Sequence, residues 1–312
     1  MKLLFAALFC GLVFSFAVSA QRRVAITIDD LPVVSTRTDI KTRREITKKL
    51  LGHIKKAKIP AIGFVNENKL YKNGERDADQ IALLKMWLDA GLELGNHTYS
   101  HRSLHSMPLA DYEADLLKGE TITKELLKER GKTIRFFRHP YLQTGRTDEI
   151  KTEFDKFLKD HGYTIAPISF DNADYIFSRA YDVAYDKHDK KFMKKVGDAY
   201  IPYMKAKLMY WEKQSNKLFG REIAQTLLIH ANFINSDYLD DLAKMFKERG
   251  YEFVDLETAL KDEAYAKADR YYGAAGISWL HRWALEEGRE KLEKDEPHVP
   301  DFVLKLSGFE SE

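Results

Sequence analysis

The stretch Val24-Ala25-Ile26-Thr27-Ile28-Asp29-Asp30 joins a short apolar run to a pair of acidic residues. An apolar run of this length predicts a buried strand, which would end where the acidic pair begins. Adjacent carboxylates repel each other, so folding them together is unfavourable unless a positive charge lies between them. A divalent cation would supply that charge. The alternative is a plain loop without an ion, in which Asp30-Leu31-Pro32 forms a turn.

Short apolar runs and amphipathic segments alternate along most of the remaining chain. Further strands are predicted at 61–65, 92–94, 134–137, 164–170, 226–229 and 251–254, and helices at 38–58, 79–90, 109–130, 147–161 and 236–249. This alternation favours an α/β fold with a mostly parallel sheet. Its regularity favours a closed or nearly closed barrel over an open sheet. Barrels of this kind carry their chemistry at the C-terminal ends of the strands.

Two segments interrupt the alternation. Residues 176–222 are rich in Lys, Tyr and Met and predict an inserted helical hairpin, and residues 264–312 form a C-terminal extension that contains Trp279 and Trp283. We expect residues 21–312 to form a single catalytic domain, with both segments reshaping its substrate groove.

The first 20 residues have the three parts of a secretory signal peptide. Lys2 gives a positive start, Leu3 to Val18 is apolar, and Val18-Ser19-Ala20 offers a cleavage site. Export to the periplasm or secretion is therefore predicted, without stable membrane insertion after cleavage. An uncleaved N-terminal anchor is the alternative. Cys10, the single cysteine, lies in the part to be removed, which excludes disulfides and a thiol nucleophile from the mature chain.

The charges are nearly balanced, with a formal net charge of +2 and both signs interspersed. A nucleic-acid partner or binding to an anionic membrane surface has no electrostatic support from such a distribution.

Two histidines four residues apart follow the predicted third strand. His97 and His101 would lie on one face of a helical turn and could hold one metal ion together. With one of the two aspartates they make a nitrogen, nitrogen and oxygen set that suits Zn²⁺, although Co²⁺, Ni²⁺ or Mn²⁺ would also fit. The other aspartate would then act as base on the metal-bound water. His105 is interpreted as a surface or supporting residue.

Further ionisable groups follow the fourth, fifth and sixth strands. Arg138 could hold the base carboxylate through a two-pronged contact, or form a structural ion pair at the barrel rim. The peptide N–H of Tyr141 could face a developing oxyanion. His230 is a candidate general acid or a plain core histidine, and Asp171 or Asp174 could lie beside it and keep it protonated.

These motifs, in this order, resemble those of the polysaccharide deacetylases, carbohydrate esterase family 4. The matching stretches are Ile26-Thr27-Ile28-Asp29-Asp30, His97-Thr98-Tyr99-Ser100-His101, Arg138-His139-Pro140-Tyr141, Asp171 to Tyr175, and Leu228-Ile229-His230. The sequence departs from the family pattern in having Leu31 after the acidic pair and Tyr175 where the family has tryptophan.

The resemblance implies a distorted (β/α) barrel of seven or eight strands and hydrolysis of an acetyl group on a carbohydrate. It implies that Asp30, His97 and His101 bind the metal. It also implies that Asp29 is the base, Arg138 orients the base, and Tyr141 supplies an oxyanion N–H. His230 would be the acid, tuned by Asp174. The partner expected from it is an acetylated glycan.

Two other functions stay open on the sequence alone. The same barrel could hydrolyse another non-peptide C–N bond, or the protein could be a catalytically inactive glycan-binding protein. An Asp29→Asn variant separates the readings, because an enzyme would lose turnover while a binder would keep its affinity.

Overall fold

The computed structural model describes residues 21–289 and 295–312 of the chain, so the signal peptide predicted over residues 1–20 lies outside the described residues. Its strands are β1 (Arg22–Val34), β2 (Ile62–Val65), β3 (Tyr71–Lys72), β4 (Glu75–Arg76), β5 (Glu93–Asn96), β6 (Phe136–Phe137), β7 (Thr164–Ile165), β8 (Gln225–Asn232) and β9 (Tyr251–Phe253). Its helices are α1 (Ile40–Ala57), α2 (Ala78–Asp89), α3 (Leu109–Lys118), α4 (Thr121–Lys128), α5 (Asp148–Asp160), α6 (Asp174–Asp186), α7 (Lys190–Phe219), α8 (Phe233–Glu248), α9 (Leu256–Ala259), α10 (Trp279–Glu286) and α11 (Asp301–Ser307). Short 3₁₀ helices are η1 (Glu67–Leu70), η2 (Leu104–Ser106), η3 (Pro140–Leu142) and η4 (Glu263–Ala266).

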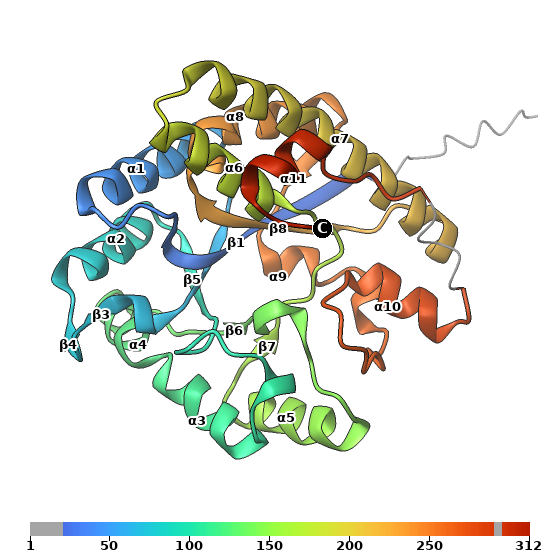
Figure 1. Ribbon diagram of the computed structural model, residues 1–312. Coiled ribbons are helices and arrows are strands. Elements are labelled where there is room, and N and C mark those ends of the chain that lie inside the picture. The colour runs from blue at the N-terminus through green and yellow to red at the C-terminus, as the bar shows by residue number, and fades with distance from the viewer. Residues whose placement is uncertain (1–20, 290–294) are drawn as a thin grey trace, which may run out of the picture.

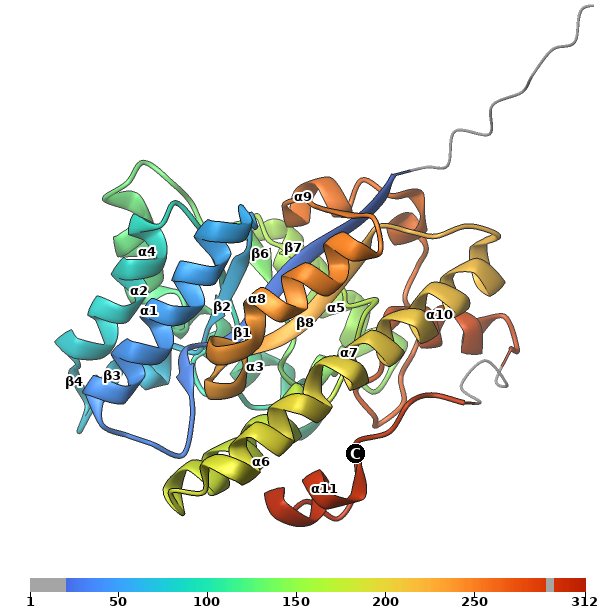
Figure 2. The same ribbon diagram turned by 90° about the horizontal axis from the view of Figure 1, so that it is seen from above.

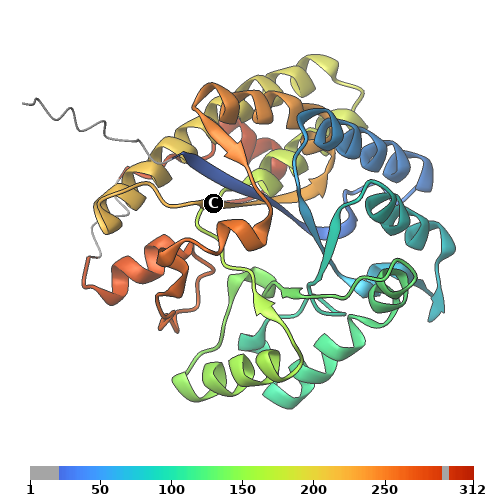
Figure 3. The same ribbon diagram turned by 180° about the vertical axis from the view of Figure 1, so that it is seen from behind.

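Within the described residues, seven parallel strands form one curled sheet, a half-barrel surrounded by helices (Figures 1 and 3). The strand order is β7-β6-β5-β2-β1-β8, and β9 pairs with the first residues of β1. β1 pairs with three strands, β2, β8 and β9, and its Val24 pairs with Gln225 of β8 and with Phe253 of β9. The predicted distorted (β/α) barrel is confirmed, and the carboxyl ends of its strands meet at one face.

An irregular segment joins the two edges of this sheet. The strand predicted over residues 164–170 is interrupted: β7 pairs with β6, whereas Phe170 pairs with Leu227 of β8. The peptide N–H of Phe170 donates to the carbonyl of Thr226 at 3.0 Å. Pro167 lies between the two pairings and has no N–H to donate, which explains why the strand is broken there. The barrel is thus completed by single contacts instead of a full ladder.

The helix predicted over residues 109–130 is in fact two helices, α3 and α4. The chain breaks at Gly119, where a Cβ atom would overlap the backbone of Thr98 and Tyr99. A continuous helix with an ordinary side chain at this position would therefore push away the loop that follows β5. That loop carries the two predicted metal-binding histidines.

The segment predicted as a helical insertion forms the antiparallel helices α6 and α7. Phe177 of α6 packs on Tyr200 and Tyr203 of α7, with ring centroids 5.3 and 4.9 Å apart. Helix α11 lies against α6 on the same side of the molecule (Figures 1 and 2). Trp279 and Trp283 of the C-terminal extension are both buried, so neither side chain lines an open groove, and reshaping of the groove by the extension stays a prediction. No helix among residues 21–289 and 295–312 has the length and apolar character of a membrane span.

Candidate metal and active site

The two adjacent carboxylates at the end of β1 turn toward the same place. Successive side chains of a regular strand point to opposite faces, which would separate them. Here Asp30 adopts a left-handed conformation with φ 67°, and the register of β1 with its neighbours shifts at this point. Both carboxylates consequently reach His97, whose Nε2 lies 3.8 Å from Asp29 Oδ2 and 3.8 Å from Asp30 Oδ1.

The two histidines lie on an irregular loop and not on the helical turn that their spacing suggested. Thr98 and His101 both have positive φ, at 62° and 54°, and these turns bring the two imidazole rings together at a centroid distance of 4.9 Å. His97 Nδ1 lies 2.7 Å from the carbonyl of Arg138, which fixes a proton on that nitrogen and leaves Nε2 free as a ligand. Burial holds the pKa of His97 well below its ordinary value, and it also lowers the pKa of His101.

Within the described part of the chain, Asp30, His97 and His101 are the one group whose ligand atoms are close enough to share a metal ion. These atoms lie within 4.8 Å of one another. Asp30 Oδ1 is buried without a hydrogen-bond partner, only 3.4 Å from His101 Nε2. A buried carboxylate oxygen without a donor is unfavourable, and a divalent cation would satisfy it. Two imidazole nitrogens and one carboxylate oxygen therefore fit such an ion.

Lys69 belongs to this group of charges, although the sequence did not single it out. Its Nζ donates to the carbonyl of Asp30 at 2.9 Å and lies 3.7 Å from Asp30 Oδ1. Burial alone would raise the pKa of Asp30, but Lys69 and the two histidines hold that pKa far below its usual value. A sequence signal for Lys69 exists in its position shortly after the strand predicted at 61–65. Each of the other five strands predicted up to residue 229 is followed by a candidate ionisable group, and this one is not.

Asp29 is buried and held from one side by Arg138. Arg138 Nη1 lies 3.3 Å from Asp29 Oδ2, while its Nη2 donates to Thr27 Oγ1 at 3.0 Å. The predicted two-pronged contact with the carboxylate is wrong, because the second prong goes to Thr27. Burial raises the pKa of Asp29 to about 6 in spite of the nearby guanidinium. Asp29 Oδ1 has no hydrogen-bond partner, so that oxygen is free to accept a proton.

His230 lies beside Asp29, because the two residues are paired in register across β1 and β8. Its Nδ1 lies 2.7 Å from Asp174 Oδ1. The second oxygen of Asp174 accepts hydrogen bonds from the peptide N–H of His230 at 2.9 Å and from the side-chain amides of Asn232 at 2.9 Å and Asn235 at 2.7 Å. Burial would lower the pKa of His230, but Asp174 raises it to about 9. Of the two aspartates considered, Asp174 is the partner of His230.

The remaining predicted residues lie at the rim of the site. Tyr141 has φ 56° and is 56% exposed, and its ring centroid is 4.7 Å from that of His101. The role of its peptide N–H stays a prediction. Tyr175 is partly exposed, with its ring 6.4 Å from that of His230. His105 lies apart from the metal group and accepts a hydrogen bond from the peptide N–H of Gly145 at 3.1 Å. Leu31 is fully buried, and its side chain packs against Gly63 of β2.

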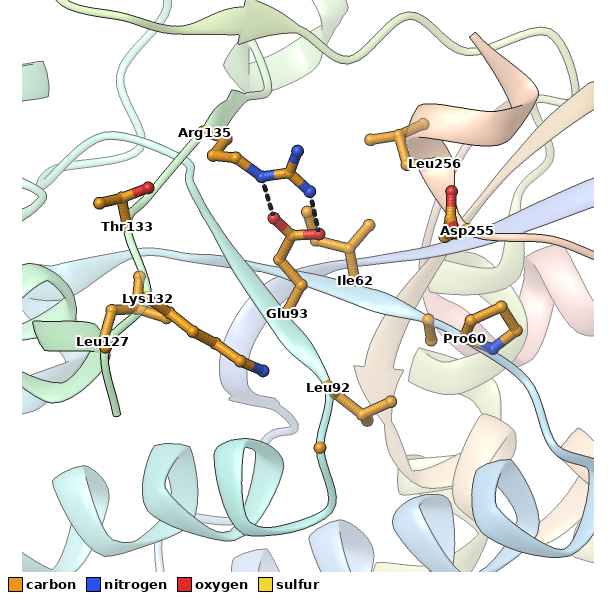
Figure 4. A pocket seen from close by; sticks show the side chains of 13 residues that line it. Pro60, Ile62, Leu92, Glu93, Leu127, Lys132, Thr133, Arg135, Asp255 and Leu256 are labelled. Atoms are coloured by element: carbon orange, nitrogen blue, oxygen red, sulfur yellow. Dashed lines mark hydrogen bonds and ion pairs between the residues drawn. The ribbon is translucent and has the colours of Figure 1, made fainter. Parts of the chain in front are cut away.

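A separate pocket of about 410 Å³ opens at the other end of the barrel (Figure 4). It is lined by Ile62 and Glu93, the first residues of β2 and β5, and so lies away from the carboxyl ends of the strands. Arg135 forms ion pairs there with Glu93 at 2.9 Å and with Glu257 at 2.8 Å. Because these charges are paired with one another, the chemistry is assigned to the metal and active site at the opposite end.

The family model described as polysaccharide deacetylase matches residues 18–166. The peptidoglycan-N-acetylglucosamine deacetylase of Bacillus cereus is 28% identical over 155 residues, which make up 50% of this chain and 47% of that protein. The chain thus matches about half the length of this curated relative.

Solved structures share the fold. Two mutants of a family 4 carbohydrate esterase pseudoenzyme, one of them with restored enzymatic activity, have TM-scores of 0.51 and 0.52 at 17% identity. Each match covers 78% of this chain and 68% of the other. The wild-type pseudoenzyme, from Bacillus anthracis, has a TM-score of 0.49 at 15% identity and covers 78% and 66% of the two chains. At these identities the likeness concerns the fold alone.

Proposed function

We propose that this chain is a member of the polysaccharide deacetylase family, whose model matches residues 18–166, and that it hydrolyses N-acetyl groups on a carbohydrate or cell-wall glycan with the help of a divalent metal ion. The observation that carries the proposal is that the potential metal group of Asp30, His97 and His101 adjoins the buried carboxylate of Asp29, whose Oδ1 has no hydrogen-bond partner, and that Asp29 lies beside His230, whose pKa is raised. Zn²⁺ is the ion proposed, with Co²⁺, Ni²⁺ or Mn²⁺ as alternatives.

The side chains around the metal group divide the chemistry between them. When bound, a divalent ion lowers the pKa of water and polarises a carbonyl group. Asp29 accepts the proton of the attacking water on Oδ1, while Arg138 holds its other oxygen. The peptide N–H of Tyr141 is assigned to the developing oxyanion.

His230 is assigned the opposite task. Its charge is maintained by Asp174, so that it donates a proton to the nitrogen that leaves with the sugar as acetate is released. Hydrolytic sites typically contain an acid and a base whose pKa values are shifted by their surroundings, as those of His230 and Asp29 are here. The raised pKa of His230 favours the protonated form that an acid requires.

Export is proposed as well, from the N-terminal stretch alone. An acetylated cell-wall or extracellular glycan is then the partner that the protein would meet after its signal peptide is removed.

Acetate release from N-acetylglucosamine oligomers, peptidoglycan and acetylated xylan, measured with and without chelator and Zn²⁺, tests this function. Chelator-sensitive release is expected. The Asp29→Asn variant should lose about 10²- to 10⁴-fold in kcat, while Asp79→Asn, an exposed aspartate on α2, serves as matched control. If no substrate yields acetate despite bound metal, the deacetylase proposal fails in favour of another C–N hydrolase or a glycan-binding protein.

A further inference from the structure

Exposed aromatic side chains gather around the metal and active site. In the part of the chain that the structure describes, the exposed large apolar side chains are those of Leu117, Tyr141, Tyr175, Met209 and Phe309. Three of these five are aromatic, and two of the three lie next to a histidine of the site. Tyr141 contacts His101 on the metal side, and Tyr175 lies next to His230 on the acid side. Such rings are unfavourable in water unless something covers them.

Phe309 extends this surface from the far end of the chain. Its ring centroid is 5.5 Å from that of Tyr175, at an interplanar angle of 80°. The two rings are 42% and 39% exposed, so neither one covers the other. A residue of the C-terminal extension therefore lies next to Tyr175, which in turn lies next to His230.

The position of Phe309 is determined by the segment that carries it. Helix α11 packs against α6, with Val303 fully buried between them, and ends at Gly308 with φ 81°. The peptide N–H of Phe309 then donates to Ser307 Oγ at 3.2 Å. Figures 1 and 2 show this segment on the same side of the molecule as α6, whose first residue is Asp174.

The end of the segment is held by an ion-pair cluster on α7. Lys207 is buried and lies 2.6 Å from Glu296 and 2.9 Å from Glu312. Tyr203 donates to Glu312 at 2.8 Å, and its hydroxyl accepts from the peptide N–H of Ala173 at 2.9 Å. The same tyrosine thus ties the C-terminal segment to the residue that precedes Asp174.

We propose that Phe309, together with Tyr175, contacts the sugar that carries the scissile N-acetyl group. This inference rests on the proposed function, in which His230 protonates the departing nitrogen. Because that nitrogen stays on the sugar when its bond to the acetyl carbonyl carbon breaks, the sugar must lie on the His230 side of the site. Tyr175 and Phe309 are the exposed rings there, and the apolar face of a pyranose ring would cover them.

This placement predicts a substrate preference. The C-terminal segment should increase the affinity for a substrate whose acetamide is attached to a sugar. It should not increase the affinity for a small acetyl ester that has no sugar. Removing the ring should therefore raise KM for the glycan about tenfold, leave kcat within about twofold, and leave hydrolysis of p-nitrophenyl acetate unchanged.

The experiment compares the full-length variants Phe309→Ala, Phe309→Leu and Phe309→Trp. Leu117→Ala is the control for loss of an exposed apolar side chain, because Leu117 lies on α3 and is 39% exposed. Affinity for an N-acetylglucosamine tetramer is measured by calorimetry in the Asp29→Asn background, beside KM, kcat and the thermal midpoint in the otherwise unmodified enzyme. Alanine and leucine should weaken binding about tenfold, and tryptophan should keep it. Leu117→Ala should have no effect.

The outcomes separate the two claims. Equal affinity in all variants, or an equal loss of activity on glycan and ester together with a lower thermal midpoint, would overturn the role of Phe309 in contacting sugar. Tetramer binding that depends on Phe309 without acetate release from any substrate would overturn the proposed deacetylase and keep the contact. If the unmodified chain releases no acetate and does not bind the tetramer, both are overturned.

Discussion

Asp174 is the side chain that maintains the charge of His230. Its carboxylate accepts a hydrogen bond from the imidazole of His230 and three more from N–H groups, all at donor–acceptor distances of 2.9 Å or less. Replacing it with asparagine would remove the charge that raises the pKa of His230 to about 9. Burial, which acts in the opposite direction, would then dominate.

We expect Asp174→Asn to move the alkaline limb of kcat/KM to lower pH. The acid form of His230 persists below its pKa, so the unmodified enzyme should lose activity as the pH rises through about 9. The variant should lose it one or more pH units earlier, a deficit of roughly tenfold at pH 8. The profile of acetate release against pH measures this. Asp171→Asn is the control, and an alkaline limb that moves equally in both variants would contradict the assignment.

Lys69 offers a second test at the scale of single residues. In the metal-free protein it is the nearest cation to Asp30 apart from the histidines. Lys69→Met should lower the free energy of unfolding of the metal-free protein by roughly 1–2 kcal/mol, because a carboxylate loses its partner. The loss should shrink when a bound cation replaces that charge.

Urea unfolding with chelator and with saturating Zn²⁺ measures both values, and Lys72→Met on exposed β3 is the control. An equal loss in the two conditions would mean that Lys69 supports the loop alone and does not balance the charge of the metal group.

At the scale of elements, the break between α3 and α4 makes room for the histidine loop. Gly119→Ala would place a methyl group against the backbone of Thr98 and Tyr99, which cannot move without displacing His97 and His101. We expect a loss of roughly 1–3 kcal/mol in the free energy of unfolding together with weaker metal binding.

Gly52→Ala is the matched control for this change. Gly52 lies inside α1 with no atom near the position of an added Cβ, so alanine should raise the free energy of unfolding by roughly 0.5–1 kcal/mol. Chemical denaturation and metal titration of both variants give the comparison. Unchanged metal affinity in Gly119→Ala would show that the break does not position the loop.

At the scale of the whole molecule, the C-terminal segment is joined to the barrel by charge. Burial alone would raise the pKa of Glu312, but Lys207, Tyr203 and the peptide N–H of Val299 lower it below its usual 4.5. A lowered pKa in the folded state means that the contribution to stability is complete above about pH 4.5 and is lost as the pH falls through the folded value.

Glu312→Gln should therefore reduce the free energy of unfolding by roughly 1 kcal/mol at pH 7, a figure that allows for screening by solvent. Its stability should also change less than that of the unmodified protein between pH 6 and pH 3. Urea unfolding at several pH values measures this, with the exposed Glu310→Gln as control. If the free energy of unfolding depends on pH in the same way in both variants, the ion pair between Glu312 and Lys207 does not stabilise the C-terminal segment.

The sequence by itself determined the class of fold and most of the residue types at the site. Apolar runs of strand length alternate with amphipathic segments, and burial of both kinds of face allows few arrangements other than helices around a parallel sheet. Parallel strands end at one face, so Asp30, His97, Arg138 and His230 could be expected to meet from strand ends alone.

Only the tertiary structure decided how these residues meet. The left-handed turns at Asp30 and His101, the break at Gly119 and the second prong of Arg138 on Thr27 depend on contacts between elements far apart in the chain. The contact of Lys69 with Asp30 and that of Phe309 with Tyr175 depend on tertiary packing in the same way. A local pattern records which face of an element is apolar, whereas the partner of a charge or the neighbour of an exposed ring is set by packing across the whole molecule.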